Sequence, residues 1–264
     1  MRVCTLAVYT GVWSDLPLVI AANRDEFYER PTRGPGPLGC GRAFGGRDLR
    51  AGGSWLALGA EGLAVGVLNR RTDNPADPSL RSRGELCVRL AEESSTGDAL
   101  ATLSSEDPDA YNPFNLLLAD REGAWVAQNR EGEMVVRALP GGLHLLTNLD
   151  LNDPTCQRIS RSTDRFAALI ERYRDHRDRE VLVASLREIL SDHLLPLDDR
   201  SPTDQLCIHV PGYGTRSSSV VWIDREGSPR FLHADGPPCE TRFEAQDLSC
   251  FGRPPVGRGT MGGS

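Results

Sequence analysis

The chain of 264 residues contains no lysine, so all 30 of its basic residues are arginines. This absence excludes Schiff-base catalysis and any other mechanism that needs a lysine amine. Long apolar runs are also missing: no stretch of roughly 18 uncharged apolar residues occurs, and the sequence therefore predicts no membrane-spanning helix. Near the start, Trp13, Ser14, Asp15 and Pro17 interrupt the apolar pattern, so we expect no signal peptide there.

Paired spacings typical of disulfides and metal sites are equally scarce. The seven cysteines stand singly, at positions 4, 40, 87, 156, 207, 239 and 250. No CxxC pair occurs, and the five histidines show neither HxH nor HxxxH spacing, so the sequence favours neither a disulfide framework nor a dedicated metal site. We expect reduced thiols and a cytoplasmic location. The glycine-rich segment GGRDLRAGGS matches neither GxGxxG nor GxxxxGK, which argues against a phosphate-binding loop.

Charge and composition narrow the class of partner. The formal net charge is -7, whereas a basic surface is the usual footprint of a protein that binds nucleic acid or anionic membranes. Hydrophobic residues make up 39% of the chain and charged residues 25%, which is ordinary for a globular protein. We therefore expect a globular protein whose partner is a small molecule, with no nucleic-acid partner.

Short runs rich in valine, leucine and isoleucine predict strands, and helical spacing of apolar residues predicts helices. The glycine- and proline-rich residues 30–46 predict a loop. The expected helices are 82–93, 154–173 and 179–190. The expected strands are 4–9, 17–22, 54–58, 63–68, 114–119, 124–128, 134–138, 143–147, 205–210, 217–224 and 229–233.

Runs of strands alternate with blocks of helix, and no βαβ rhythm runs through the chain. This order predicts an α+β fold in which helices cover antiparallel sheets. No linker or internal repeat interrupts residues 1–250, so we expect one domain there. Residues 251–264 are rich in glycine and proline, and we expect a flexible tail.

Cys4 and the polar tetrad Asn23-Arg24-Asp25-Glu26 are the first candidates for chemistry. A cysteine near the chain start is a nucleophile if it becomes the first residue, because its own α-amine then acts as base; otherwise it is a buried strand cysteine. The tetrad is either a solvated turn or the floor of a site. In a site, Arg24 would lower the pKa of a nearby thiol or hold a substrate carboxylate.

Six motifs in order along the chain carry a family resemblance: AANRDEFYERPT, AGGSWLAL, GLAVGVLN, YNPFNLLLAD, LLTNLDLNDP and PGYGTRSSSVVWID. Together they resemble the NRDE family, also called the transport and Golgi organisation family, from about residue 4 to residue 235. That family is grouped with the N-terminal nucleophile hydrolases. The resemblance therefore implies a four-layer αββα sandwich, an architecture compatible with the expected strands and helices.

The resemblance extends to the cysteine branch of that superfamily, the penicillin V acylases and bile-salt hydrolases. It implies that Cys4 is the nucleophile and that the tetrad lies where those enzymes place an Arg and an Asp in contact with the cysteine. The counterparts of that pair are either Arg24 with Asp25 or Asn23 with Glu26. Three further roles follow from the resemblance. The side chain of Asn148 and the backbone N–H of Asn69 would form an oxyanion hole, and Arg216 would lie near the nucleophile.

Each of these residues also has an ordinary structural interpretation. Asn148 is suited to capping a turn before Asp150, and Arg216 to a structural ion pair. Trp55 follows AGGS, so it either packs in the core, as tryptophans near strands usually do, or lines a pocket. The pocket loops are expected within residues 28–50 and 70–82.

The start of the chain departs from the family pattern. Family members usually begin Met-Cys, whereas Met1-Arg2-Val3 precedes Cys4 here, and Arg2 is too large for ordinary methionine removal. Three explanations stay open: autocatalytic cleavage before Cys4, a different true start, or a Cys4 that remains internal without an α-amine.

Besides an interaction protein with a vestigial site, two functions are consistent with these observations. The first is a cysteine amidohydrolase that cleaves a C–N amide or related acyl bond of a small molecule. The second is a non-catalytic protein of the same fold that binds or carries haem or an acyl lipid, with arginines contacting the ligand's carboxylates. No metal or resident cofactor is expected in either case.

Overall fold

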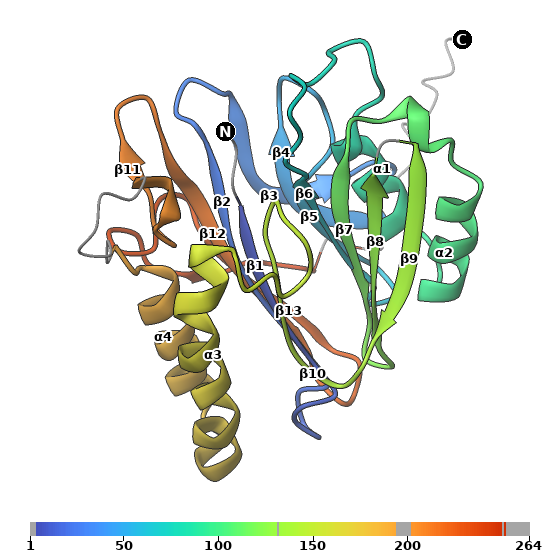
Figure 1. The fold of residues 1–264 in the computed structure, drawn as a ribbon. Coiled ribbons are helices and arrows are strands. Elements are labelled where there is room, and N and C mark those ends of the chain that lie inside the picture. Colours follow the sequence, from blue (N-terminus) through green and yellow to red (C-terminus); the bar gives the residue numbers. More distant parts are fainter. Residues whose placement is uncertain (1–3, 131, 194–201, 250, 252–264) are drawn as a thin grey trace, which may run out of the picture.

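The computed structural model describes residues 4–130, 132–193, 202–249 and 251. In this part of the chain two antiparallel sheets stack face to face, and a pair of α-helices covers the outer face of each sheet (Figure 1). The predicted four-layer αββα sandwich is therefore confirmed. The expected tail residues 252–264 lie outside the described residues, as do residues 1–3.

The first sheet has the strand order β10-β1-β2-β12-β13-β14, with β11 paired to the end of β12. Its central strands carry side chains of one parity toward the helices and of the other toward the second sheet. In β1, for example, Ala7 and Tyr9 pack against the helices, whereas Leu6 and Val8 pack between the sheets. The strands are β1 (Thr5–Thr10), β2 (Leu18–Phe27), β10 (Gly142–Leu146), β11 (His209–Val210), β12 (Tyr213–Ile223), β13 (Pro229–Ala234) and β14 (Glu244–Ala245).

The second sheet is a meander in which each strand pairs with the next along the chain, from β3 to β9. Its strands are β3 (Thr32–Leu38), β4 (Ala43–Asp48), β5 (Leu56–Gly59), β6 (Ala64–Asn69), β7 (Phe114–Ala119), β8 (Ala124–Arg130) and β9 (Glu133–Leu139).

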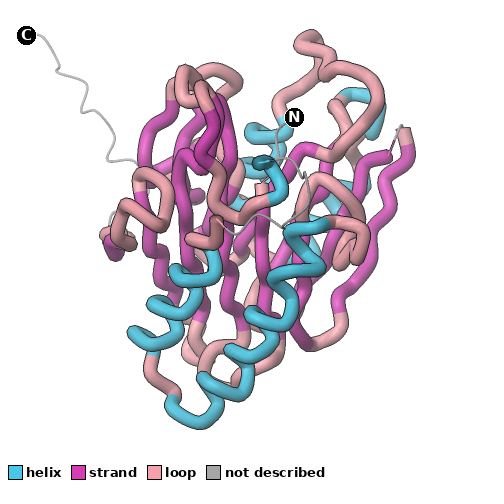
Figure 2. Tube along the Cα trace, turned by 60° about the vertical axis from the view of Figure 1, so that its left-hand side comes forward, coloured by secondary structure: helices cyan, strands magenta, loops and turns pink. Residues whose placement is uncertain are grey.

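Helices α3 (Gln157–His176) and α4 (Arg179–Leu190) lie side by side on the outer face of the first sheet (Figures 1 and 2). Helices α1 (Arg83–Ala91) and α2 (Thr96–Ser104) cover the second sheet, and two 3-10 turns occur at Pro108–Ala110 and Pro202–Asp204. Helix α1 starts where predicted because the Ser82 hydroxyl accepts a hydrogen bond from the Glu85 N–H, a standard N-cap. Three apolar cores result: helices on first sheet, sheet on sheet, and second sheet on helices.

Two sequence predictions about the strands near the start are wrong. The predicted loop 30–46 contains β3 and the first four residues of β4. Strand β3 lies at the edge of its sheet, where prolines such as Pro35 and Pro37 remove no hydrogen bond from a central ladder. Strand β2 does not stop at residue 22 but continues through the tetrad to Phe27, so the tetrad is not a solvated turn.

Two further differences lie later in the chain. Helix α2 was not predicted, and it carries a residue of low helix propensity, Gly97, in its first turn behind the Ser95 N-cap. The strand expected over 205–210 is reduced to His209–Val210. The residues just before it form loop contacts, among them a hydrogen bond from the Cys207 N–H to the Asp192 carbonyl at 3.0 Å.

A buried ion pair fastens α3 to the first sheet. The Arg158 guanidinium donates to Asp25 Oδ2 at 2.8 Å and to Thr5 Oγ1 at 3.0 Å, and the side chains of Arg158 and Asp25 are 1% and 0% exposed. On its other side Asp25 accepts a 2.6 Å hydrogen bond from the Thr215 hydroxyl. Arg158 also donates twice to the Thr203 carbonyl, at 2.8 and 2.6 Å. One carboxylate thus joins β1, β2, β12 and α3.

Replacing Arg158 with methionine should lower the free energy of unfolding by about 3–5 kcal/mol, because it leaves the Asp25 carboxylate buried without a counter-charge. Adding Asp25→Asn should recover part of that loss, since it removes the orphaned charge. Urea unfolding followed by circular dichroism measures both effects.

The matched control is Arg172→Ala, an exposed arginine of the same helix, which should change stability by no more than about 0.5 kcal/mol. An Arg158→Met variant as stable as Arg172→Ala would contradict the role assigned to the ion pair.

Candidate active site

A cavity of about 520 Å³ opens at the edge of the sheet-on-sheet core, beside the start of β1. This volume is in the range of small-molecule sites. Its walls come from the end of β2, the loop between β4 and β5, the loop leading into α1, and the end of β6. The lining residues are Cys4, Arg24, Asp25, Glu26, Arg30, Asp48, Arg50, Ala51, Gly52, Ser54, Trp55, Val67, Asn69, Ala76, Asp77, Pro78, Leu80, Arg81, Ser82, Arg83, Gly84 and Asn112.

Cys4 is half-buried and contacts this cavity from the position just before the start of β1. In the β1 pairings Thr5 faces Asn23 and Leu6 faces Leu146. The same registers, continued by one and two residues, set Cys4 opposite Arg24 on one side and Asn148 on the other. The Cys4 Sγ lies 3.8 Å from the Asp25 carbonyl oxygen. Burial and the nearby Asp25 raise the pKa of the Cys4 thiol to about 11, although Arg24 acts in the opposite direction.

The strand alternation of β2 divides the tetrad between two faces of the sheet. Arg24 and Glu26 point into the cavity, where they form an ion pair at 3.8 Å. Asn23 and the Asp25 carboxylate point toward the helices: the Asn23 amide donates to the carbonyls of Leu190 and Leu206, at 2.8 and 2.9 Å. Of the tetrad, Asn23 therefore turns its side chain away from the cavity, to the other face of the strand.

Asp25 contacts the Cys4 thiol through its backbone and not through its carboxylate. It lines the cavity, and its carbonyl lies near the Cys4 thiol, while its carboxylate is occupied by Arg158 and Thr215. Burial raises the pKa of this carboxyl, and the Arg158 ion pair and the Thr215 hydroxyl lower it. The acid beside Arg24 in the cavity is Glu26, a pairing that neither of the two alternatives contained.

Arg24 is the centre of a charged network on the cavity wall. Its guanidinium lies over the Trp55 ring, 4.2 Å from the centroid, and 3.7 Å from Asp48 Oδ2. Arg30 continues the network with a 2.7 Å contact to Asp48 and a 3.5 Å contact to Glu26. Two arginines and two acids thus hold one another, and the Asp48 carboxyl has a lowered pKa because hydrogen bonds from Arg30 and the following backbone outweigh the effect of its burial.

Trp55 lines the cavity as one of its two sequence interpretations expected, and close backbone packing holds it there. Gly46 lies under its ring: a Cβ at that position would come within 2.2 Å of the indole. Gly53, two residues before Trp55, has φ +70°, and a Cβ there would meet the Gly84 carbonyl carbon at 2.0 Å. The AGGS motif therefore allows the β4–β5 loop to contact the start of α1, which closes one wall.

The remaining predicted residues differ in their distance from the cavity. Asn69 ends β6 and lines it. Asn148 is buried next to the continued end of β10, where its carbonyl accepts from the Arg71 N–H at 2.8 Å, but it is not a lining residue. Arg216 is the extra residue of a β-bulge between Thr215 and Ser217. It also lies off the lining, and its Nε is buried without a hydrogen-bond partner in the described residues.

Several charged lining residues were not predicted individually, because they lie in loops or at the ends of strands and helices, where apolar periodicity gives no signal. Arg30 and Asp48 complete the network around Arg24, and Arg50, Arg81 and Arg83 also line the cavity. The local signal was the density of arginine and glycine in ERPTRG, GGRDLRAGG and RSRG. Arg158, which holds Asp25, was also missed, since nothing in a helix sequence marks a buried arginine.

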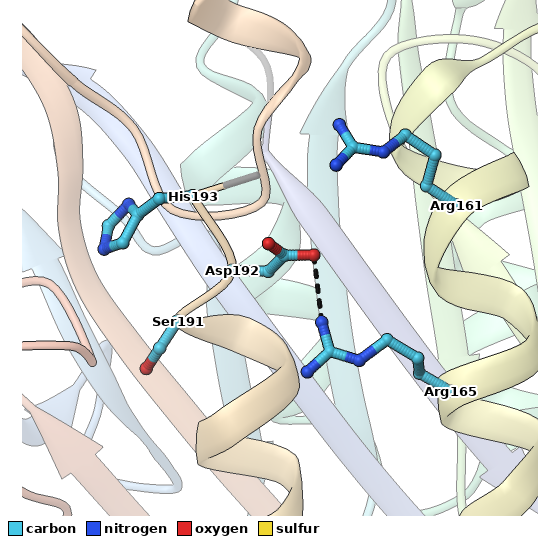
Figure 3. Close-up of a pocket in the computed structure, with 5 residues that line it drawn as sticks. All are labelled: Arg161, Arg165, Ser191, Asp192 and His193. Carbon is cyan, nitrogen blue, oxygen red and sulfur yellow. Dashed lines mark hydrogen bonds and ion pairs between the residues drawn. The ribbon is translucent and has the colours of Figure 1, made fainter. Parts of the chain in front are cut away.

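A second hollow of about 570 Å³ lies near the ends of α3 and α4 (Figure 3). It is lined by Arg161, Arg165, Ser191, Asp192 and His193. Arg165 donates to Asp192 at 2.9 Å across it, and no thiol lines it. This hollow therefore offers no sulfur nucleophile, whereas the cavity beside Cys4 does. No helix in the described part of the chain is long and apolar enough to cross a membrane.

Comparison with solved structures agrees with the fold. An N-acylethanolamine-hydrolyzing acid amidase ortholog from Caenorhabditis elegans superposes with a TM-score of 0.53 at 15% identity, covering 82% of this chain and 92% of that one. The R18L variant of a conjugated bile acid hydrolase from Clostridium perfringens superposes with a TM-score of 0.55 at 11% identity, covering 93% and 92%. At these identities the likeness shows the fold alone, which is N-terminal nucleophile hydrolase-like.

Comparison of sequences identifies the family. The model of the family described as Transport and Golgi organisation 2 matches residues 3–235. The Transport and Golgi organization protein 2 homolog of Bos taurus is 30% identical over 240 residues, covering 81% of this chain and 84% of the relative. The human homolog is 29% identical over the same length and coverage. The family resemblance of the six motifs is confirmed: this chain belongs to the Transport and Golgi organisation 2 family.

Proposed function

We propose that this protein is a cysteine amidohydrolase that cleaves a C–N amide or related acyl bond of a small molecule, with Cys4 as nucleophile. The observation that carries the proposal is the position of Cys4: its half-buried thiol contacts a cavity of about 520 Å³ at the very start of β1. Two solved structures of the same fold are an amidase and a hydrolase by their titles, which supports the same class of chemistry here.

The reaction needs two acyl-transfer steps. The Cys4 sulfur attacks the acyl carbon, the C–N bond breaks, and the thiol proton passes to the leaving amine, which gives a thioester and a free amine. Water then adds to the thioester carbon, its proton returns to the sulfur, and the carboxylic acid leaves. An α-amine on Cys4 would carry the proton in both steps, because its usual pKa of about 7.7–8 suits a base at neutral pH.

The oxyanion formed in each step needs aimed N–H donors. Asn69 is the better placed of the two predicted donors, since it lines the cavity on the wall formed by the second sheet. Asn148 is adjacent to Cys4 by strand register but off the lining, so it would contribute only if its side chain turned toward the bound carbonyl. Arg216 would act only by positioning.

The walls indicate the kind of acyl amide that fits. Trp55 and Val67 provide apolar surface near Cys4, and the lining arginines favour a substrate with an anionic or strongly polar group. Arg24 itself is paired with Glu26 and Asp48, so it is suited to positioning the thiol rather than to binding a carboxylate. We infer a substrate with an apolar acyl part and a polar amine part, acted on in the cytoplasm, where unpaired cysteines persist.

A second candidate function is supported by the thiol itself. With residues before Cys4 still attached, the pKa of about 11 keeps the sulfur protonated at neutral pH, and no α-amine is available as base. In that form the cavity would bind an apolar ligand that carries carboxylates, such as haem or an acyl lipid as cargo, between Trp55 and the lining arginines. Removal of residues 1–3 is thus the step that separates a hydrolase from a carrier.

Cys4→Ala should reduce kcat on the order of 10⁴-fold or more in protein whose N-terminal residue is Cys4, because the nucleophile is lost. An N-acylethanolamine and a conjugated bile acid are suitable first probes, with release of the amine as readout. Cys40→Ala, at an exposed cysteine away from the cavity, should leave the rate unchanged.

Intact mass and ligand binding distinguish the two candidates. Loss of the Met1-Arg2-Val3 mass in the purified protein supports the hydrolase. Full-length protein that turns over neither probe, and that binds haem or a fatty acid saturably with and without Cys4→Ala, would overturn the hydrolase in favour of the carrier. The carrier fails in turn if titration with both ligands shows no saturable binding.

Alkylation of Cys4 should report its raised pKa. Only the thiolate reacts, so at pH 8 a group with a pKa of about 11 is ionised in about one molecule in a thousand, and its rate with iodoacetamide should rise about tenfold per pH unit up to pH 11. Mass mapping of the Cys4 and Cys40 peptides in one sample provides the internal reference. A Cys4 rate that levels off below pH 9 in the full-length chain would contradict the burial of the thiol.

A further inference from the structure

Four potential metal ligands converge on one side of the first sheet, away from the Cys4 cavity. They are His193, Cys207, His209 and Cys239, here called the Cys2His2 cluster, and their ligand atoms all lie within 4.8 Å of one another. His193 follows α4, and Cys239 lies in the loop after β13. Cys207 lies just before β11, and His209 is the first residue of that strand. The fold has therefore brought together three segments that are far apart in the sequence.

The separations among Cys207, His209 and Cys239 match those of ligands around one tetrahedral ion. Zinc takes thiolate at about 2.3 Å and imidazole nitrogen at about 2.0–2.1 Å, which places two sulfurs about 3.8 Å apart and a sulfur and a nitrogen about 3.5 Å apart. The Cys207 and Cys239 sulfurs are 3.7 Å apart. His209 Nε2 lies 3.6 Å from the Cys207 sulfur and 3.3 Å from the Cys239 sulfur.

The orientation of His193 points to the same conclusion. Its Nδ1 lies 3.0 Å from the Cys207 carbonyl oxygen, and because a carbonyl only accepts, Nδ1 must carry the proton. Nε2 is then the nitrogen with a free lone pair. Metal-binding histidines are typically held in this way, with the second ring nitrogen donating to a carbonyl or carboxylate. Figure 3 shows the His193 ring turned away from Arg161, Arg165 and Asp192, so it is not part of their ion pair.

The backbone around the cluster is held by contacts that do not involve the ligand side chains. The Cys207 N–H donates to Asp192 at 3.0 Å, and the Arg187 side chain of α4 donates to the Pro238 carbonyl at 2.8 Å, next to Cys239. The ligands are thus presented from anchored segments, as metal binding without a large ordering cost requires.

We propose that the Cys2His2 cluster binds one zinc ion as a closed structural site that clamps the end of α4, β11 and the loop after β13. Both thiols lose their protons to solvent on binding, and the two thiolates and two neutral imidazoles fill all four positions of the ion. Two thiolates and two imidazoles suit zinc better than the oxygen-seeking cations magnesium and calcium. The inference does not depend on whether Cys4 is catalytic.

The clamp has a direct structural link to Asp25. Ile208, between two of the ligands, donates its N–H to the Thr215 hydroxyl oxygen at 3.0 Å and accepts from the Thr215 N–H at 2.9 Å. Thr215 in turn donates to the Asp25 carboxylate at 2.6 Å. The ion therefore stabilises the segment that positions Thr215 against the buried Arg158–Asp25 pair.

Sequence spacing gave no reason to expect this site. The only local signal is Cys-x-His at Cys207–His209, and the other two ligands lie well before and well after it. Common zinc motifs place ligands in close pairs, such as two cysteines two to four residues apart, so a search for those pairs passes over this arrangement.

The test is the metal content of untagged full-length protein purified under reducing conditions with zinc present. We expect about one zinc per chain by mass spectrometry, falling to near zero in Cys239→Ser and in His209→Asn. The matched controls Cys40→Ser and His176→Asn, at exposed residues outside the cluster, should keep the full amount. Replacement of zinc by cobalt should give the visible bands and thiolate charge-transfer band of tetrahedral cobalt.

Other outcomes would overturn the proposal. Wild-type protein that holds no zinc after reconstitution, a cobalt spectrum without thiolate bands, or equal metal loss in the control variants would each do so. A Cys207–Cys239 disulfide in the freshly purified, zinc-supplied protein would point to a redox pair instead. If Cys239→Ser fails to fold, the His209→Asn variant and the cobalt spectrum of the wild-type protein still decide the question.

Discussion

The buried ion pair between Arg158 and Asp25 is the interaction on which the candidate site depends. It fixes the start of α3 against the ends of β1 and β2, and through Thr215 it also holds β12. Asp25 must face the helices to meet Arg158. Because side chains alternate along a strand, its two neighbours, Arg24 and Glu26, must face the cavity. A charged pair buried on one face of the sheet thus decides which charges surround Cys4 on the other face.

The cavity and the Cys2His2 cluster are both connected to this ion pair, the cavity through Asp25 and the cluster through Thr215, and they suit different purposes. Around Cys4, the arginine and acid side chains neutralise one another and leave a half-buried thiol whose ionisation is suppressed by burial. At the cluster, a divalent cation would offset the free-energy cost of burying negative charge, since the ligand form of a thiol is the thiolate. The two proposals thus give different cysteines different roles: Cys4 the catalytic one, and Cys207 with Cys239 the structural one.

The parts of the fold that were predictable are those in which local pattern and tertiary environment agree. Strand β7 and helix α4 fall on the predicted residues, because a run of buried apolar residues and an Asp178 N-cap mark them locally. Strand β3 was hidden by prolines that only an edge position tolerates, and the end of β2 by polar residues that are buried through pairing rather than solvated. Of the site, Cys4, Arg24, Glu26, Trp55 and Asn69 were expected from the family motifs, whereas Arg30, Asp48 and Arg158 were not.

By itself the sequence determined the family, the layered α+β class and the presence of a cysteine at the start of the first strand, since motifs and periodicity are local properties of the chain. Only the tertiary structure decided which face each residue of Asn23–Glu26 occupies, because that depends on the partner that Asp25 finds 133 residues away in Arg158. It also decided that a histidine after α4, a Cys-x-His step and a lone cysteine in a distant loop meet at one point. Apolar periodicity shows that a segment packs against something. It does not show which distant segment is the partner, and only the packing of the whole chain decides that.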